Sequence, residues 1–323
     1  MNAVFLDFAT LGAAELDTAA LDTALPGLVA YAATPPAEVA ARIAAAECVL
    51  LNKVRIGRAE MAAAPHLAFI GVAATGVDNV DLDEAQRRGI AVCNIRAYCT
   101  QSVVEHVFGV LLALAHSIGR LRSAVRDGAW QRAGQFCVLD YPLRELSAMT
   151  LGIVGHGELG SAVARTARHF GMRVLIARRP GTRGTQDDGR VALDELLARA
   201  DAVSLHCPLT ADTQQLIGAR ELQRMKSDAI LINTARGGLV DSAALVAALE
   251  QGRIGGAAID VLPQEPPLDG DPLLACAHPS LIVTPHVAWA TREARQQAVD
   301  QLAATVLAYQ RGERLNRVDR LPS

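Results

Sequence analysis

Three polar residues in the last third of the chain have the side chains that hydride transfer to a carbonyl group requires. Each follows an apolar run that we expect to be a strand: Arg236 in NTARGG, Glu265 in PQEP and His286 in TPHVAW. Strand C-terminal ends of an open parallel sheet face the ligand crevice, so the three can converge there. An imidazole can protonate the carbonyl oxygen, a carboxylate can orient that imidazole, and a guanidinium can clamp the carboxylate of a 2-oxo acid. We therefore predict His286 as proton donor, Glu265 as its partner and Arg236 as the substrate clamp.

Each of these residues also has a purely structural interpretation. Arg236 precedes two glycines and could lie in a surface turn, Glu265 lies between prolines and could belong to a rigid exposed loop, and His286 alone could be a hydrogen-bonded structural histidine. The other histidines show no comparable carboxylate arrangement, and we assign them no role.

The stretch from Thr150 to Pro180 has the order strand, glycine-rich turn, helix, strand. Its turn is Gly155-His156-Gly157-Glu158-Leu159-Gly160. In such a turn the first glycine permits the tight bend, the second lets a pyrophosphate approach the backbone, and the third lets the helix pack closely on the strand. The helix N-terminus then offers free N–H groups to the phosphates. We predict a dinucleotide site here; the alternative is a glycine turn that only connects the elements.

Arg178 and Arg179 follow the second strand of this unit, where a NAD-binding fingerprint would carry an acidic residue for the ribose hydroxyls. A guanidinium has no acceptor for a hydroxyl but can bind a 2′-phosphate bidentately. The cofactor is therefore predicted to be NADP or NAD, with NADP favoured by Arg178. The alternative is that both arginines are only solvated charges.

Strands and helices alternate along both halves of the chain, which predicts an α/β protein. The second half, with strands expected near Ala202–His206, Ala229–Asn233, Gly256–Asp260 and Leu281–Thr284, is predicted to be a Rossmann-type doubly wound parallel sheet. The first, up to Tyr98, is expected to be a smaller parallel α/β domain. Its loop from Val72 to Asp78 follows a strand end and could hold an anion with backbone N–H groups, or be a plain turn.

The segment between the halves begins with Thr100–Ser117, which is apolar nearly all round and predicts a buried helix. Within it, we interpret Glu105 and His106 as interface residues rather than catalysts. The next stretch, Gly119–Ser147, is predicted to be irregular, and it carries aromatic residues. Such a stretch in a compact enzyme suggests a partner surface, most simply for a second subunit.

Composition excludes several classes of protein. The 323 residues, 51% hydrophobic and 20% charged with a net charge of −3, predict two ordinary globular domains without the basic field of a nucleic-acid-binding protein. No apolar run is long enough to span a bilayer, so no membrane partner is expected. The six cysteines are far apart, with no metal-type spacing, which predicts reduced thiols and no metal site. Together with the lack of a signal peptide, this predicts a cytoplasmic location.

Several motifs in this order resemble the D-isomer-specific 2-hydroxyacid dehydrogenase family. They are ATGVDNVDL, GHGELG, HCPLT, INTARGGLVD, AAIDV followed by QEPP, and TPHVAWAT. The similarity covers essentially the whole chain and is highly specific. Within the family the chain looks most like the glycerate dehydrogenase (hydroxypyruvate reductase) group, because of FLD near the start, QFCVLDYPLREL, and His-Val-Ala-Trp where many relatives carry His-Ile-Gly.

The resemblance implies a role for each matching residue. The family's catalytic arginine, glutamate and histidine fall on Arg236, Glu265 and His286. Its substrate-carboxylate loop matches Ala73, Ala74, Thr75 and Gly76. The positions that match cofactor contacts are Glu158, Leu159, Cys207, Pro208, Thr213, Thr234, Ala235 and Asp260.

The resemblance also implies a homodimer and a split, flavodoxin-like substrate domain. That domain would comprise residues 1–98 and 289–323, and the dinucleotide-binding domain residues 99–288. Two residues depart from the family pattern. Arg178 puts NAD preference in doubt, and Trp289, three residues past the proton donor, could narrow or cap the substrate pocket.

The predicted function is an NAD(P)H-dependent reductase of small 2-oxo acids, with hydroxypyruvate and glyoxylate as the leading substrates. One alternative is a nucleotide-sensing binding module like the transcriptional corepressors that share this fold. Another keeps the enzyme family but changes the substrate to a small anion such as phosphite or formate. The complete Arg, Glu and His set argues against the binding module.

Overall fold

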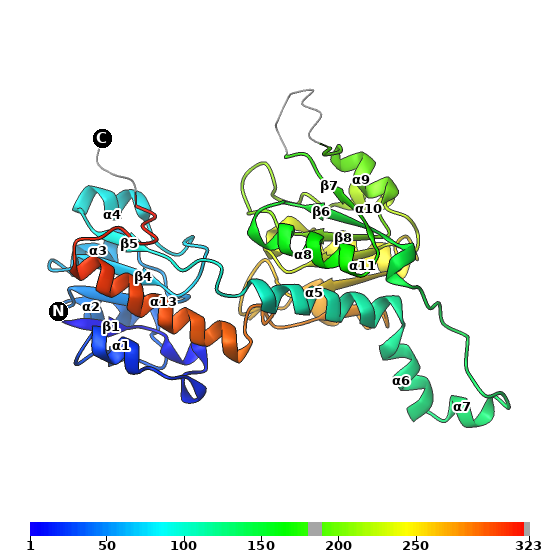
Figure 1. Cartoon of the computed structure of the whole chain (residues 1–323), viewed down its shortest axis with the longest axis horizontal. Helices are drawn as coiled ribbons and strands as arrows, with labels where there is room; N and C mark the ends of the chain where they lie inside the picture. The colour runs from blue at the N-terminus through cyan, green and yellow to red at the C-terminus, as the bar shows by residue number, and fades with distance from the viewer. Residues whose placement is uncertain (180–188, 320–323) are drawn as a thin grey trace. The chain divides into compact units, whose positions relative to one another are not determined.

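A computed structural model describes residues 1–179 and 189–319 of the chain. The predicted end points Pro180 and Ser323 lie outside these residues. The chain divides into two compact units, one made of Met1–Cys99 with Ala290–Ser323 and the other of Thr100–Trp289. The six cysteines are all free thiols. Each unit contains one parallel sheet (Figure 1).

The discontinuous unit is built on a five-stranded parallel sheet in the order β2-β1-β3-β4-β5. This is the flavodoxin-like order, and the predicted fold class is confirmed for this unit. Every strand except the edge strand β2 is buried throughout, because helices cover both faces of a parallel sheet. The strands are β1 (Ala3–Phe5), β2 (Val29–Ala30), β3 (Cys48–Leu51), β4 (Phe69–Val72) and β5 (Ala91–Cys93).

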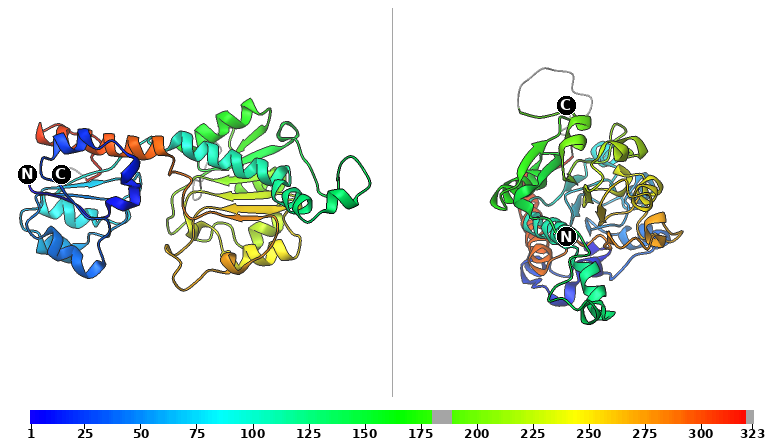
Figure 2. Two further views of the ribbon diagram at one scale, coloured as in Figure 1. Left: turned by 90° about the horizontal axis from the view of Figure 1, so that it is seen from below. Right: turned by 90° about the vertical axis from the view of Figure 1, so that its right-hand side faces the viewer.

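Two layers of helices enclose this sheet. Helices α1 (Ala19–Ala24) and α13 (Arg292–Gln310) cover one face, and α2 (Val39–Ile43), α3 (Arg58–Ala63) and α4 (Leu82–Arg88) cover the other (Figure 2). The last long helix therefore packs with the first part of the chain, where Tyr309 contacts Phe69 at 4.9 Å between ring centroids. Short 3-10 turns at Phe8–Leu11, Ala13–Glu15 and Pro36–Glu38 complete the unit.

The continuous unit is built on a six-stranded parallel sheet in the order β11-β10-β9-β8-β6-β7. The order reverses at β6, so the crevice between β6 and β8 is the topological switch point of a doubly wound sheet. This confirms the predicted Rossmann-type architecture. The strands are β6 (Thr150–Val154), β7 (Arg173–Ile176), β8 (Ala202–Leu205), β9 (Ile230–Asn233), β10 (Gly256–Ile259) and β11 (Leu281–Val283).

Helices flank both faces of this second sheet as well. On one side lie α5 (Thr100–Ala115) and α8 (Glu158–His169), and on the other α9 (Leu193–Arg199), α10 (Ala219–Arg224), α11 (Ser242–Glu250) and α12 (Pro272–Ala275) (Figure 2). The predicted helix after Thr100 is thus α5, whose valine, leucine and phenylalanine side chains are largely buried. Two 3-10 turns, Leu146–Ala148 and Gly237–Leu239, follow the irregular segment and β9.

The prediction of an irregular stretch at Gly119–Ser147 is wrong for its first part. Residues 118–132 form α6 (Ile118–Arg126) and α7 (Ala129–Arg132), separated by Gly128 with a φ of 74°. The helical spacing of Ile118, Leu121 and Val125 was the available signal, but the many arginines between them masked it.

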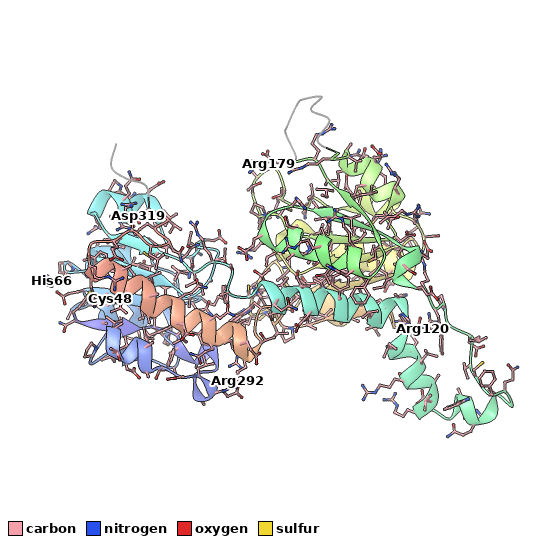
Figure 3. All side chains as sticks on the ribbon, viewed as in Figure 1. Cys48, His66, Arg120, Arg179, Arg292 and Asp319 are labelled. Atoms are coloured by element: carbon pink, nitrogen blue, oxygen red, sulfur yellow. The ribbon has the colours of Figure 1, made fainter. Side chains whose placement is uncertain are left out.

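After α7 the chain runs without helix or strand from Ala133 to Glu145, as expected. The Arg120 guanidinium, labelled in Figure 3, lies 4.2 Å from the centre of the Tyr141 ring and ties this return segment to α6. Among the described residues, no single helix is long and apolar enough to cross a membrane. Helices α5 and α6 pass that test only when joined across a 55° bend.

Candidate active site

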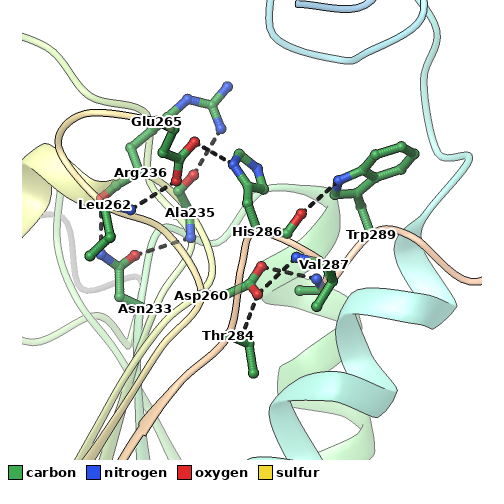
Figure 4. A network of polar contacts seen from close by, with 11 residues as sticks. Asn233, Ala235, Arg236, Asp260, Leu262, Glu265, Thr284, His286, Val287 and Trp289 are labelled. Carbon is green, nitrogen blue, oxygen red and sulfur yellow. Dashed lines mark hydrogen bonds and ion pairs between the residues drawn. The ribbon is translucent and has the colours of Figure 1, made fainter. Parts of the chain in front are cut away.

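The imidazole of His286 and the carboxylate of Glu265 form a close pair beyond the ends of β10 and β11. Their Nδ1 and Oε2 atoms are 2.6 Å apart (Figure 4). The second carboxylate oxygen of Glu265 accepts the backbone N–H of Leu262 at 2.8 Å, so the carboxylate is itself held in place. The His286 side chain is 27% exposed and that of Glu265 34% exposed. Both side chains are therefore accessible to a substrate. The carboxylate is placed to stabilise a positively charged imidazolium.

Hydrogen bonds to the buried side chain of Asp260 hold the loop that carries His286. The Asp260 side chain, 1% exposed, accepts the backbone N–H groups of Val287 and Ala288, both at 2.9 Å, and the Thr284 hydroxyl at 2.5 Å. The Asp260 carbonyl oxygen also accepts the N–H of His286 at 2.8 Å. Asp260, which the sequence predicted as a cofactor contact, thus holds the backbone of the His286 loop. Its location at the end of β10 gave no sequence signal for that role.

Arg236 is positioned by a second loop, after β9. Buried Asn233 fastens this loop, because its amide donates to the carbonyl of Arg236 at 2.9 Å and accepts the N–H of Ala235 at 3.0 Å. The next residue, Gly237, lies against the loop after β10: a Cβ there would come within 2.0 Å of the carbonyl carbon of Leu262. Only glycine allows this approach of the two loops. Figure 4 shows the Arg236 and Glu265 side chains extending the same way as the His286 ring.

The glycine-rich turn between β6 and α8 has the geometry of a dinucleotide cradle. Gly155 has a φ of 94°, and a Cβ on Gly160 would lie 1.9 Å from the carbonyl oxygen of Gly155, so a side chain at either position would break the turn. A Cβ on Gly157, the N-cap of α8, would meet nothing within 4 Å. The backbone at the start of α8 is therefore unobstructed at Gly157, as close approach of a pyrophosphate requires.

The remaining predicted cofactor residues lie at the carboxyl ends of the neighbouring strands. Thr234, after β9, has a buried hydroxyl oxygen with no hydrogen-bond partner among the described residues. A bound ligand would supply that partner, which fits a cofactor in this crevice. Cys207 and Pro208 follow β8, and Thr213 closes their loop by donating its hydroxyl to the Pro208 carbonyl at 2.8 Å. Ala235 lies in the Arg236 loop, next to Thr234.

Glu158 and Leu159 form the start of α8 in the same turn. The Glu158 carboxylate accepts a hydrogen bond from the hydroxyl of Thr100, the first residue of α5. A carboxylate at this helix terminus is an unusual neighbour for a pyrophosphate, although it interacts favourably with the helix dipole. The pairing with Thr100 had no signal in the sequence, because 58 residues separate the two.

The predicted substrate loop lies in the other unit, directly after β4. Ala73 and Ala74 are buried, and the Ala73 N–H donates to the carbonyl of Leu51 at 2.7 Å, so that N–H is not available to an anion. Thr75 is exposed and Gly76 half-buried. Of the four predicted residues, these two are therefore the ones that solvent reaches.

No group of three or more histidine, cysteine, aspartate or glutamate residues in the described parts of the chain could hold a metal ion. His106 of α5, interpreted from the sequence as an interface residue, has its Nε2 atom 3.3 Å from the Thr284 hydroxyl, beneath the His286 loop.

Comparison with known proteins identifies the family. Residues 108–288 match the model of the D-isomer specific 2-hydroxyacid dehydrogenase NAD binding domain. The chain is 46% identical over 284 residues to a glycerate dehydrogenase of Methylorubrum extorquens, covering 88% of this chain and 89% of that protein. It is 34% identical to a hydroxypyruvate reductase of Blautia hydrogenotrophica, covering 99% and 100% of the two chains.

A solved structure of a D-2-hydroxyacid dehydrogenase also resembles this chain over its whole length. The D-lactate dehydrogenase of Aquifex aeolicus, complexed with NAD and lactic acid, superposes with a TM-score of 0.80 at 28% identity, covering all of both chains. The family and reaction class predicted from the sequence are therefore confirmed. The chain belongs to the D-isomer specific 2-hydroxyacid dehydrogenase family, as an oxidoreductase that uses a nicotinamide cofactor to reduce 2-oxo acids to D-2-hydroxy acids.

Proposed function

We propose that this enzyme reduces hydroxypyruvate to D-glycerate and glyoxylate to glycolate. The observation that carries the proposal is the Glu265–His286 pair, with Nδ1 and Oε2 2.6 Å apart, next to a loop that presents Arg236. The relatives named glycerate dehydrogenase and hydroxypyruvate reductase support the choice of substrate.

Each of the three side chains has a separate task in this proposal. The nicotinamide dinucleotide supplies the hydride when it is bound. Arg236 grips the substrate carboxylate and polarises the carbonyl group beside it. His286 donates a proton from Nε2 to the carbonyl oxygen, while Glu265 holds Nδ1 and stabilises the charged ring before the proton leaves.

The test is a comparison of kcat/KM for hydroxypyruvate, glyoxylate, pyruvate, phosphite and formate with the purified enzyme, the last two in the oxidative direction. We expect hydroxypyruvate and glyoxylate to be the best substrates. A higher kcat/KM for pyruvate would assign a different 2-oxo acid. Turnover of phosphite or formate alone would overturn the proposed reaction at this site.

We also propose distinct roles for the two units. The continuous unit, with the glycine-rich turn, would bind the dinucleotide. The discontinuous unit would act as the substrate domain through Thr75 and Gly76, whose backbone could hold the substrate carboxylate. The position of this loop directly after the end of β4 supports the assignment, because parallel sheets bind ligands at strand carboxyl ends.

The charges near the glycine-rich turn support NADPH as the preferred cofactor. Arg178 is half-buried just after β7, where its guanidinium donates to the Arg190 carbonyl at 3.3 Å, and Arg179 beside it is exposed (Figure 3). Burial, together with the charges of three arginines (Arg190, Arg168 and Arg165), lowers the pKa of His156 inside the turn. This positive surrounding would attract a 2′-phosphate.

Replacing Arg178 by aspartate should reverse the cofactor preference. The carboxylate would accept the ribose hydroxyls of NADH and repel the 2′-phosphate of NADPH, so we expect the ratio of kcat/KM for NADPH to that for NADH to fall by about 10²-fold. Arg173→Asp, at the exposed start of the same strand, is the matched control and should leave the ratio unchanged. If the wild-type enzyme preferred NADH and Arg178→Asp did not change that preference, Arg178 would have no role in cofactor selection.

The segment after α5 is proposed to bind a second copy of the chain. It exposes several large apolar side chains within 26 residues of chain, and Phe136 is 90% exposed. The residues concerned are Ile118, Val125, Trp130, Phe136, Leu139 and Leu143. A homodimer would bury this surface, which we call the arm surface. A cytoplasmic location, in keeping with free cysteines, stays a prediction.

Phe136→Asp tests the homodimer. A charge at the most exposed apolar position of the arm surface should weaken association by at least about tenfold, because it would be buried without a partner. Sedimentation of the two proteins at matched concentrations would measure this. Gln135→Asp, on the neighbouring exposed residue, is the control for added charge. A wild-type protein that sediments as a monomer would contradict the proposal.

A further inference from the structure

His286 has a backbone conformation that a non-glycine residue rarely adopts. Its φ is 56°, in the left-handed region. For a residue with a Cβ this conformation is strained, and it persists only where surrounding contacts determine it. Because φ and ψ decide where the Cα–Cβ bond points, the position of the imidazole depends on whatever maintains this conformation.

Hydrogen bonds hold the backbone of His286 on both sides. On the amino side, its N–H donates to the carbonyl of Asp260 at 2.8 Å. On the carboxyl side, its carbonyl oxygen accepts the indole N–H of Trp289 at 3.0 Å (Figure 4). The Asp260 carboxylate holds the next two N–H groups of the loop. Of the side chains described here, that of Trp289 is the one that bonds to the carbonyl of His286 itself.

We infer that Trp289 is a positioning residue for proton transfer. Its indole N–H fixes the peptide that follows His286, and this keeps the imidazole aligned with Glu265 and with the reacting carbonyl group. The inference rests on the proposed role of His286 as proton donor. It gives a task to the tryptophan that departs from the family pattern, through the backbone of His286 rather than through the width of the substrate pocket.

The two roles for Trp289 predict different kinetics. A tryptophan that walls the pocket would act through ring volume and would change KM according to substrate size. A tryptophan that acts through its N–H would change kcat alike for all substrates, because proton transfer is common to them. The substitution Trp289→Phe distinguishes the two roles, because phenylalanine keeps an aromatic ring but lacks the N–H donor.

Trp289→Phe should lower kcat about three- to tenfold for hydroxypyruvate and glyoxylate alike, the effect of one lost neutral hydrogen bond on the transition state. KM and the dissociation constant of NADPH should stay within about twofold of wild type. The solvent deuterium isotope effect on kcat should rise, because a misaligned imidazole makes proton transfer more rate-limiting. Trp289→Met, which also lacks the donor, is a second variant in case Trp289→Phe folds poorly.

A side-chain donor elsewhere in the chain provides the matched control. Gln310, at the end of α13, also donates a side-chain N–H to a backbone carbonyl, that of Ala24, at 2.9 Å. Gln310→Met removes the same kind of bond within the discontinuous unit. Its kcat and isotope effect should match wild type.

Three results would overturn the inference. The first is a wild-type kcat and isotope effect in Trp289→Phe. The second is a change that is confined to KM and graded with substrate size, and the third is an equal loss of kcat in Gln310→Met. Failure of the proposed function is a separate result. It would appear as a wild-type enzyme that reduces no 2-oxo acid, or as full turnover without the imidazole of His286.

Discussion

Replacing His286 by asparagine should lower kcat for 2-oxo acid reduction by about 10²- to 10⁴-fold, the usual contribution of a positioned general acid. Asparagine tolerates the left-handed backbone found here, with a φ of 56°, so the loop should keep its conformation. Its amide can still bond to Glu265 but cannot deliver a proton near neutral pH. The dissociation constant of the dinucleotide, measured by fluorescence titration, should be nearly unchanged.

The control for this substitution is His66→Asn. His66 is exposed in the discontinuous unit and labelled in Figure 3, so kcat should be unaffected. A loss of less than about tenfold in His286→Asn would mean that another group protonates the product, since a general acid contributes more than this. A loss of the same size in dinucleotide affinity would instead indicate that the loop had collapsed.

The second large effect is expected for Arg236→Lys. Lysine keeps the charge but loses the planar fork that binds a carboxylate with two parallel hydrogen bonds. It also loses the bond from Nη1 to the Ala235 carbonyl, 2.8 Å long, that orients the guanidinium. We expect kcat/KM for hydroxypyruvate to fall by about 10²-fold or more, comparable with removal of one donor from an oxyanion hole. Both a higher KM and a lower kcat should contribute.

Arg253→Lys is the matched control, because Arg253 is exposed after α11 and its guanidinium donates to the Gln223 carbonyl at 3.4 Å. Its kcat/KM should equal that of wild type. If Arg236→Lys kept an unchanged KM for 2-oxo acids, the clamp would have to be assigned elsewhere. Free guanidinium offers a further check, since partial rescue of Arg236→Ala would indicate that the missing group acts directly on the substrate.

Much of the fold could be predicted because its signals are local. The buried strands of a parallel sheet are continuous apolar runs, and the glycine-rich turn has fixed spacing, so β6, α8 and β7 follow from about 30 residues. The two-residue strand β2, exposed at a sheet edge, gave no such run. Helix α6 was missed because arginines separate its apolar residues, and α7 because four residues are too few to show a helical period.

The residues of the candidate site could be predicted from the sequence, but the contacts that hold them in position could not. Arg236, Glu265 and His286 follow strands, and topology alone explains why such residues can gather. The left-handed backbone of His286, the buried carboxylate of Asp260 beneath its loop, and the bond from Trp289 depend on how separate loops meet. Such contacts between loops have no periodicity and no fixed spacing, so the sequence carries no direct signal for them.

The most direct test of the central claim is the chirality of the product. Hydroxypyruvate would be reduced with excess NADH and, separately, with excess NADPH, and the glycerate formed would be resolved into its D and L isomers. The account predicts D-glycerate with at least one cofactor. It predicts about 10²- to 10⁴-fold slower formation of D-glycerate when the assay is repeated with His286→Asn at equal enzyme concentration. Formation of L-glycerate, or no reduction with either cofactor, would contradict it.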